Sequence, residues 1–125
     1  MIVGLGMDLI EVSRFETELR ERGDGMIEAV LLPSEIAYCR TKHRPCQHYA
    51  VRFAAKEALF KALGTGLAGE MSWHDVEVLR DERGVPSLAL TGETKKVAAK
   101  AGVGKIHLSL THSDEYAAAV VTLED

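Results

Sequence analysis

Hydrophobic positions in the first 25 residues predict one strand followed by one short helix. Ile2–Ile10 is rich in apolar and β-branched residues and is broken by Gly4 and Gly6, a pattern typical of a strand that another backbone approaches closely. Ser13–Glu16 has the spacing of a helix capping box, so we expect a helix to begin there and to end at Gly23–Gly25.

The next stretch of the chain predicts two further helices. Pro33 or Ser34 suits the first turn of a short helix that runs toward Arg40. A polar, basic connection separates it from a long helix, expected at about Gln47–Leu63, where strong helix formers occupy most positions. Gly64 follows the last apolar residue and is expected to close this helix ahead of a glycine-rich loop.

Strand-like alternation dominates the second half of the chain. A turn at Asp81–Gly84 joins two expected strands as a hairpin, and Thr91–Ala101 is expected to be helical and closed by Gly102. Another turn, Thr111–Asp114, joins the last two strands. The four strands are expected at Trp73–Arg80, Pro86–Leu90, Ile106–Leu110 and Tyr116–Leu123. Short helices with antiparallel strands, and no regular strand–helix–strand repeat, indicate an α+β fold in which a small antiparallel sheet packs against helices.

Length and composition indicate one domain spanning residues 1–125. The chain is 46% hydrophobic and 27% charged, which is ordinary for a globular protein. Its net charge of -4 provides no general attraction to nucleic acid or to an anionic membrane, so we expect neither as a partner. The N-terminus lacks the basic segment of a signal peptide and no apolar run approaches about 20 residues, so we expect a cytoplasmic protein. Cys39 and Cys46 lack the spacing of a zinc site, and we expect two reduced thiols.

The long helix carries a single carboxylate, Glu57, among alanines and phenylalanines. On a helical wheel Glu57 lies between Phe53 and Ala54, one turn before Lys61. A carboxylate against a small apolar strip is costly unless an ammonium group or a metal ion pairs with it, which indicates a functional site. The alternative is structural: Glu57 and Lys61 have the favoured i,i+4 spacing of a helix salt bridge, and Gly64 is then only a cap. Taken alone, this segment favours the structural interpretation.

Two residues outside this helix offer complementary chemistry. Asp8 follows the glycines of the first strand, and His112 lies in an expected turn between hydroxyl-bearing residues. Mg²⁺ is commonly held by one or two carboxylates together with substrate phosphates, so Asp8 and Glu57 suffice for a site that binds Mg²⁺ and a pyrophosphate. Lys61, Arg52 and His112 would then take the remaining phosphate charge.

Three short motifs contain most of these candidate residues. They are Gly6-Met7-Asp8, then Arg52-Phe53-Ala54-Ala55-Lys56-Glu57-Ala58 with Lys61 and Gly64-Thr65-Gly66, and Ser109-Leu110-Thr111-His112-Ser113 before Tyr116-Ala117-Ala118-Ala119. In these motifs, their order and its overall length, the chain resembles the holo-acyl-carrier-protein synthases, which are small 4'-phosphopantetheinyl transferases. Each motif is weak alone, but three in order favour the functional interpretation of Glu57.

The resemblance implies a reaction. The phosphopantetheine arm of coenzyme A is transferred to a serine of apo-acyl carrier protein, releasing adenosine 3',5'-bisphosphate, as a step of fatty acid biosynthesis. Asp8 and Glu57 would bind Mg²⁺ against the coenzyme A pyrophosphate, where the ion would stabilise the leaving phosphate. Lys61 would assist at the same phosphates. Glu57, directly or through a metal-bound water, would act as the base for the serine.

Further contacts with coenzyme A follow from the same resemblance. The residues implied at the 3'-phosphate are Arg52, His112 and Ser113, and those implied along the cofactor are Gly64, Thr65 and Gly66. The basic run Arg40–Arg44 is open to a role at the carrier or at the 3'-phosphate, although such loops are more often simply solvated. The role of Asp114 is also open.

The expected partners are acyl carrier protein and further copies of the chain. Acyl carrier proteins are acidic, and the resemblance implies that Arg14 contacts the carrier, although the first helix mixes arginines with glutamates in the manner of a solvated face. It also implies a homotrimer with active sites at subunit interfaces. Two alternatives remain: a generic Mg²⁺-dependent phosphate hydrolase, and a non-catalytic module that binds acyl carrier protein.

Overall fold

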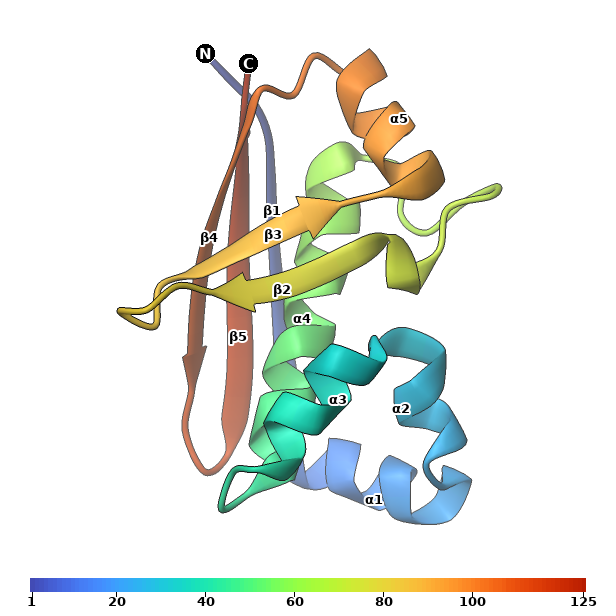
Figure 1. Cartoon of the computed structure of the whole chain (residues 1–125), viewed down its shortest axis with the longest axis vertical. Helices are drawn as coiled ribbons and strands as arrows, with labels where there is room; N and C mark the ends of the chain where they lie inside the picture. Colours follow the sequence, from blue (N-terminus) through green and yellow to red (C-terminus); the bar gives the residue numbers. More distant parts are fainter.

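The computed structural model describes all 125 residues as an α+β domain built around one long helix (Figure 1). The elements follow one another as β1 (Ile2–Glu11), α1 (Val12–Arg22), α2 (Gly25–Val30), α3 (Pro33–Arg40), α4 (Pro45–Leu63), η1 (Trp73–Asp75), β2 (Val76–Arg80), β3 (Pro86–Leu90), α5 (Gly92–Lys100), β4 (Lys105–His112) and β5 (Tyr116–Glu124). None of the helices combines the length with the apolar run that crossing a bilayer requires.

Two antiparallel sheets frame the helix α4. The larger sheet has the order β1-β5-β4, and β2 pairs with β3 as a separate hairpin. In Figure 1 α4 runs alongside the larger sheet, the β2–β3 hairpin passes across it, and α1, α2 and α3 gather around its first half. The sequence therefore predicted the fold class and the antiparallel strands correctly, and the structure divides those strands between two sheets.

Small residues allow β1 and α4 to approach closely. Gly6 is buried in β1, and a Cβ atom built there would overlap the carbonyl oxygen of Ala58 in α4. Ala54, Ala55 and Ala58 are fully buried along the same helix. The close backbone approach expected at Gly6 is confirmed, and it brings Asp8, two residues further along β1, to the side of α4.

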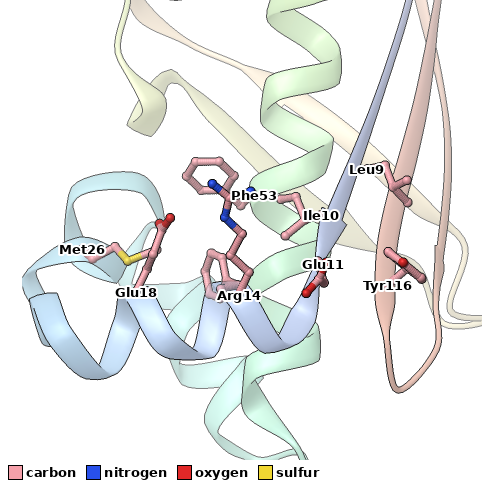
Figure 2. A pocket seen from close by; sticks show the side chains of 9 residues that line it. Leu9, Ile10, Glu11, Arg14, Glu18, Met26, Phe53 and Tyr116 are labelled. Carbon is pink, nitrogen blue, oxygen red and sulfur yellow. The ribbon is translucent and has the colours of Figure 1, made fainter.

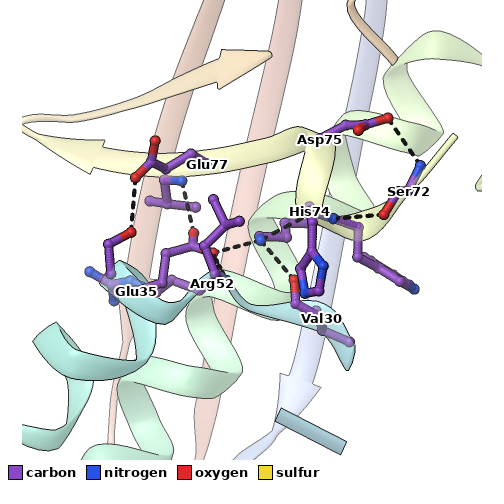
Figure 3. Close-up of polar contacts among 12 residues, drawn as sticks. Val30, Glu35, Arg52, Ser72, His74, Asp75 and Glu77 are labelled. Carbon is purple, nitrogen blue, oxygen red and sulfur yellow. Dashed lines mark hydrogen bonds and ion pairs between the residues drawn. The ribbon is translucent and has the colours of Figure 1, made fainter. Parts of the chain in front are cut away.

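A buried ion pair joins the short helices and the hairpin to α4 (Figure 3). Lys56 Nζ donates hydrogen bonds to Glu35 Oε1 at 2.7 Å and to the carbonyl oxygen of Val30 at 2.8 Å. Glu35 Oε2 accepts a hydrogen bond from the backbone N–H of Val78 in β2 at 2.9 Å. Because both charges are buried and fully engaged, this network anchors α2, α3 and β2 on a single side of α4.

Helix starts differ from the sequence-based expectation in three places. The capping box at Ser13 is wrong: α1 begins at Val12, and Ser13 Oγ donates to Glu11 Oε1 instead of accepting a helix N–H. The helix α2 was missed because its six residues are too few to show a helical period. The long helix begins at Pro45, two residues before the expected start, with the proline in its first turn.

Two strand boundaries also differ. Trp73–Asp75 forms the 3₁₀ turn η1, so β2 begins only at Val76. His112 and the residue before it belong to β4 and not to the turn, which starts at Ser113. A histidine at the end of a strand is held more firmly than one at a loop tip, because the ladder fixes its backbone.

Candidate active site

Asp8, Glu57 and Lys61 meet along β1, an edge strand of the larger sheet. Lys61 Nζ donates to Asp8 Oδ1 at 3.0 Å and to the carbonyl oxygen of Met7 at 3.1 Å. The helix salt bridge between Glu57 and Lys61, which was the structural alternative, is absent, because Lys61 pairs with Asp8 across the β1–α4 contact. The structure thus brings Asp8 and Lys61 together through tertiary packing.

Glu57 has no ion-pair partner and lies near a second carboxylate. Burial raises the pKa of Glu57 above its ordinary value, the Asp8 carboxylate raises it further, and the Lys61 ammonium opposes both effects in part. Two carboxylates with one ammonium group between them leave excess negative charge. These oxygen donors suit Mg²⁺, which needs only one or two protein carboxylates when phosphates and water complete its coordination.

Arg52 occupies the first half of α4 and is only 2% exposed. Its guanidinium lies 4.5 Å from the centroid of the Tyr38 ring, and Nη1 donates to the carbonyl oxygen of His48 at 3.3 Å. Arg52 Nε is buried without a hydrogen-bond partner. It lines a cavity of about 200 Å³ together with Tyr38, Glu77 and Arg80. A buried guanidinium with a free donor is suited to an anion.

His112 packs against the same half of α4. Its ring centroid lies 5.1 Å from that of His48, with the two rings edge to face. The pKa of His48 is lowered to about 4, first by burial and then by the nearby positive charges of His112, Arg52, Lys42 and Arg80. The surroundings of His48 are therefore electropositive and favour bound negative charge.

Ser113 begins the turn between β4 and β5. Its backbone N–H donates to the carbonyl oxygen of Tyr116 at 2.8 Å, and its Oγ accepts from the N–H groups of Glu115 at 3.2 Å and Tyr116 at 3.1 Å. The oxygen is used inside the turn, so the hydroxyl proton remains as a donor for a ligand.

The glycine loop follows α4 directly. Gly64 adopts a left-handed conformation with φ of 78°, and its N–H donates to the carbonyl oxygen of Lys61 at 3.0 Å, so the expected helix cap is confirmed. Gly66 N–H donates to the carbonyl oxygen of Phe60 at 3.2 Å, and Thr65 Oγ donates to the carbonyl oxygen of Gly66 at 2.8 Å. Thr65 is exposed on the same end of the helix as Lys61.

Within one chain the candidate residues form two groups. Asp8 and Lys61 meet at β1, whereas His112 lies on β4, and β5 separates these two strands in the sheet. Arg52 belongs with His112, because both neighbour His48. The pieces that the sequence offered as parts of one site are thus separated within one chain, at the two edges of the larger sheet.

Arg14 lines an apolar cavity of about 400 Å³ that sequence reasoning missed. Figure 2 shows its side chain reaching from α1 toward Phe53 of α4. The lining residues are Leu9, Ile10, Glu11, Arg14, Phe15, Glu18, Met26, Phe53 and Tyr116. Their apolar members resemble ordinary core positions in the sequence, and only the meeting of β1, α1, α2, α4 and β5 leaves a space among them.

Comparisons with known proteins give the family of the chain and match its fold. The family model of the 4'-phosphopantetheinyl transferase superfamily matches residues 4–121. The chain is 46% identical to the holo-[acyl-carrier-protein] synthase of Geobacter sp. (strain M21) over 124 residues, covering 99% of both proteins. Its structure matches that of the synthase from Neisseria meningitidis with a TM-score of 0.92 and 29% identity over 100% of both chains. It matches the Bacillus anthracis synthase, solved in complex with CoA (3',5'-ADP), with a TM-score of 0.80 and 40% identity, covering 98% of this chain and 96% of that one.

Proposed function

The chain belongs to the 4'-phosphopantetheinyl transferase superfamily, as an enzyme of its holo-[acyl-carrier-protein] synthase group, and on this premise we propose how its residues act. It transfers the phosphopantetheine arm of coenzyme A to a serine of acyl carrier protein. In the proposed reaction the serine oxygen attacks the phosphorus that bears the arm, the bond from that phosphorus to the bridging oxygen breaks, and adenosine 3',5'-bisphosphate leaves.

The group formed by Asp8, Glu57 and Lys61 is the observation that carries this proposal. The two carboxylates would hold Mg²⁺ beside the coenzyme A pyrophosphate, and their excess negative charge supports this assignment. When bound there, the ion would neutralise charge that develops on the bridging phosphate oxygens.

Glu57 and Lys61 are the proposed catalytic residues. Glu57 is the carboxylate of this group that has no ammonium partner, so it has oxygen lone pairs for a proton as well as for the ion. We assign it to the serine proton, which it receives directly or through a water. Lys61 is exposed and its Nζ is held by only one carboxylate, so it is available to bind an entering phosphate oxygen as well.

The electropositive group around His48 is the proposed site for the 3'-phosphate. His112 and the Ser113 hydroxyl would donate to the phosphate oxygens, and Arg52 would add its positive charge from the first half of α4. The cofactor would extend from there to the glycine loop, lined by Gly64, Thr65 and Gly66.

The carrier is proposed to dock beside Arg14. The guanidinium of Arg14 lies at an apolar cavity, so an acidic carrier would gain an ion pair at the rim and burial of an apolar side chain inside.

We further propose a homotrimer whose active sites lie between subunits. Leu5, Met7 and Leu9 project from the outer face of β1 and are 67%, 62% and 60% exposed. Across the ladder Met7 faces Val120 and Leu9 faces Ala118, so the apolar face continues onto β5. Such a face on a monomer typically marks an interface. Assembly would also let the β1 group of one subunit meet the His112 group of its neighbour.

A transfer assay separates this proposal from its alternatives. Incubation with coenzyme A, apo-acyl carrier protein and Mg²⁺ should increase the carrier mass by one phosphopantetheine group, and a chelator should abolish the increase. Phosphate release without carrier would instead support a hydrolase. Carrier binding without a change in mass would support a non-catalytic module.

A further inference from the structure

The turn between β4 and β5 is attached to the start of α4 by side-chain hydrogen bonds. The residues that donate these bonds have no role in the proposed function. Gln47 Nε2 donates to the carbonyl oxygen of Ser113 and to Asp114 Oδ1, both at 3.2 Å. Arg44 Nη1 donates to the same Asp114 oxygen at 2.9 Å. Figure 1 shows this turn beside the first residues of α4.

Gln47 is specialised for this attachment. Its side chain is only 8% exposed, and both of its contacts are made by the amide nitrogen to the turn. A buried amide that lost these acceptors would leave unsatisfied donors, which costs more than an ordinary hydrogen bond contributes. The attachment is therefore expected to persist while the turn is in place.

Arg44 takes part in the same attachment through two acidic partners. Besides Asp114 it contacts Glu16 of α1 at 3.5 Å. Its pairing with Asp114 helps to hold that carboxylate within reach of the Gln47 amide.

We propose that Gln47 and Asp114 are positioning residues that hold the β4–β5 turn so that His112 and Ser113 meet the 3'-phosphate of coenzyme A. This inference rests on the 3'-phosphate role proposed above for those two residues. The turn itself is exposed from Ser113 to Glu115, and its side-chain bonds to α4 run through Asp114 and the Ser113 carbonyl. Holding it in advance lowers the ordering cost of phosphate binding.

The test compares two donors, coenzyme A and 3'-dephospho-coenzyme A, with the full-length enzyme. Gln47→Glu keeps the side-chain size but places a carboxylate against the Ser113 carbonyl and Asp114. We expect the KM for coenzyme A to rise about tenfold, with kcat within about twofold, and the KM for the dephospho donor to stay unchanged. Asp114→Ala, at an exposed position, should shift the same KM in the same direction, and Asp114→Asn should recover part of it.

A matched control changes the outer half of the network. Glu16→Gln removes the second partner of Arg44 and leaves both bonds of Gln47 in place, so both KM values should match those of the wild type. In a His112→Ala/Ser113→Ala background, Gln47→Glu should have no further effect on the KM for coenzyme A, because the positioned groups are gone.

The positioning role would be overturned if the KM rose equally for coenzyme A and for the dephospho donor. It would also be overturned if neither Gln47→Glu nor Asp114→Ala changed the KM for coenzyme A. If His112→Ala/Ser113→Ala itself keeps the wild-type preference for coenzyme A, the 3'-phosphate assignment is wrong and this inference falls with it. If that preference is lost there but retained in Gln47→Glu and Asp114→Ala, only the positioning role is wrong.

Discussion

Glu57 has a neighbouring carboxylate but no cation of its own, because Lys61 is bonded to Asp8. Its raised pKa means that the folded protein keeps the Glu57 proton to a higher pH than the unfolded chain does. The resulting stabilisation is present below the unfolded pKa and is lost as pH rises through the raised folded pKa. At neutral pH without metal, the ionised carboxylate therefore destabilises the fold.

Glu57→Gln tests two effects of the Glu57 charge: its effect on stability and its effect on transfer activity. We expect transfer to fall at least about 100-fold, as on loss of a general base, while the melting temperature in metal-free buffer rises by about 1–3 °C. Activity is measured by carrier mass gain and stability by thermal unfolding. Glu82→Gln, at the exposed hairpin tip, is the control and should change neither. Wild-type turnover in Glu57→Gln would remove Glu57 from the mechanism.

His48 should make the protein sensitive to mild acid. Its folded pKa of about 4 lies below the ordinary value of 6.5, so the unfolded chain binds the proton first as pH falls. Stability should thus decrease between about pH 6.5 and 4. In urea unfolding across this range, His48→Phe should reduce the pH slope by up to about one proton, and His43→Phe, at an exposed position, should not. Equal slopes in His48→Phe and the wild type would refute this account.

At the residue scale, the sequence offered candidate groups without showing which of them meet. Asp8 and Lys61, which came from separate motifs, are in contact in the structure. The partner of Lys61 was wrong because helix spacing describes only local pairs, whereas β1 offers Asp8 from 53 residues away. The acceptor bonds of Ser113 Oγ depend on turn geometry, which no spacing rule specifies.

Among the elements, β1 and α4 depend on Gly6 for their distance. Gly6→Ala would place a Cβ atom against the carbonyl oxygen of Ala58. This oxygen belongs to the helix backbone, so it cannot move aside as the end of a flexible side chain can. We expect a loss of about 1–3 kcal/mol of unfolding free energy, measured by denaturant unfolding, together with reduced transfer as Asp8 moves from Lys61. Gly25→Ala is the matched control, because a Cβ there meets open space. Equal midpoints for the two variants would show that β1 accommodates the methyl group.

Element types were predicted more reliably than element ends. The long helix-forming run predicted α4, and apolar, β-branched content together with turn signals predicted all five strands. The capping box at Ser13 failed because Glu11 offers its carboxylate to the Ser13 hydroxyl. The helix α2 is too short for its period to appear in the sequence, and it is stabilised instead by burial of Met26, Ile27 and Val30.

At the scale of the whole molecule, the exposed apolar face on β1 is the proposed subunit interface. We therefore expect transfer activity to depend on formation of the homotrimer. Met7→Glu places a charge at the centre of this face, and we expect the assembly to dissociate into monomers and transfer to fall at least about tenfold. Sedimentation measures the mass, and circular dichroism checks the fold. Val85→Glu, in the exposed hairpin turn, should leave mass and activity unchanged. A Met7→Glu protein with wild-type mass would place the interface elsewhere.

Features that need several elements at once were beyond the sequence. The cavity beside Arg14 exists only where five elements meet, and its apolar lining residues resemble core residues in the sequence. The division of the candidate residues between the two sheet edges follows from strand order, which alternation does not specify. Each of these properties is tertiary, whereas the motifs describe short segments.

The buried pair of Lys56 and Glu35 also fixes the rotation of α4 about its own axis. Large buried side chains of α4, such as Leu59 and Phe60, resist rotation of the helix by packing, and the ion pair adds a directional contact to them. Consecutive helix residues point about 100° apart, and Lys56 is held on one side by Glu35 and Val30. Glu57 must therefore project toward β1. By holding Lys56 in one direction, the ion pair also sets the direction in which Glu57 faces Asp8.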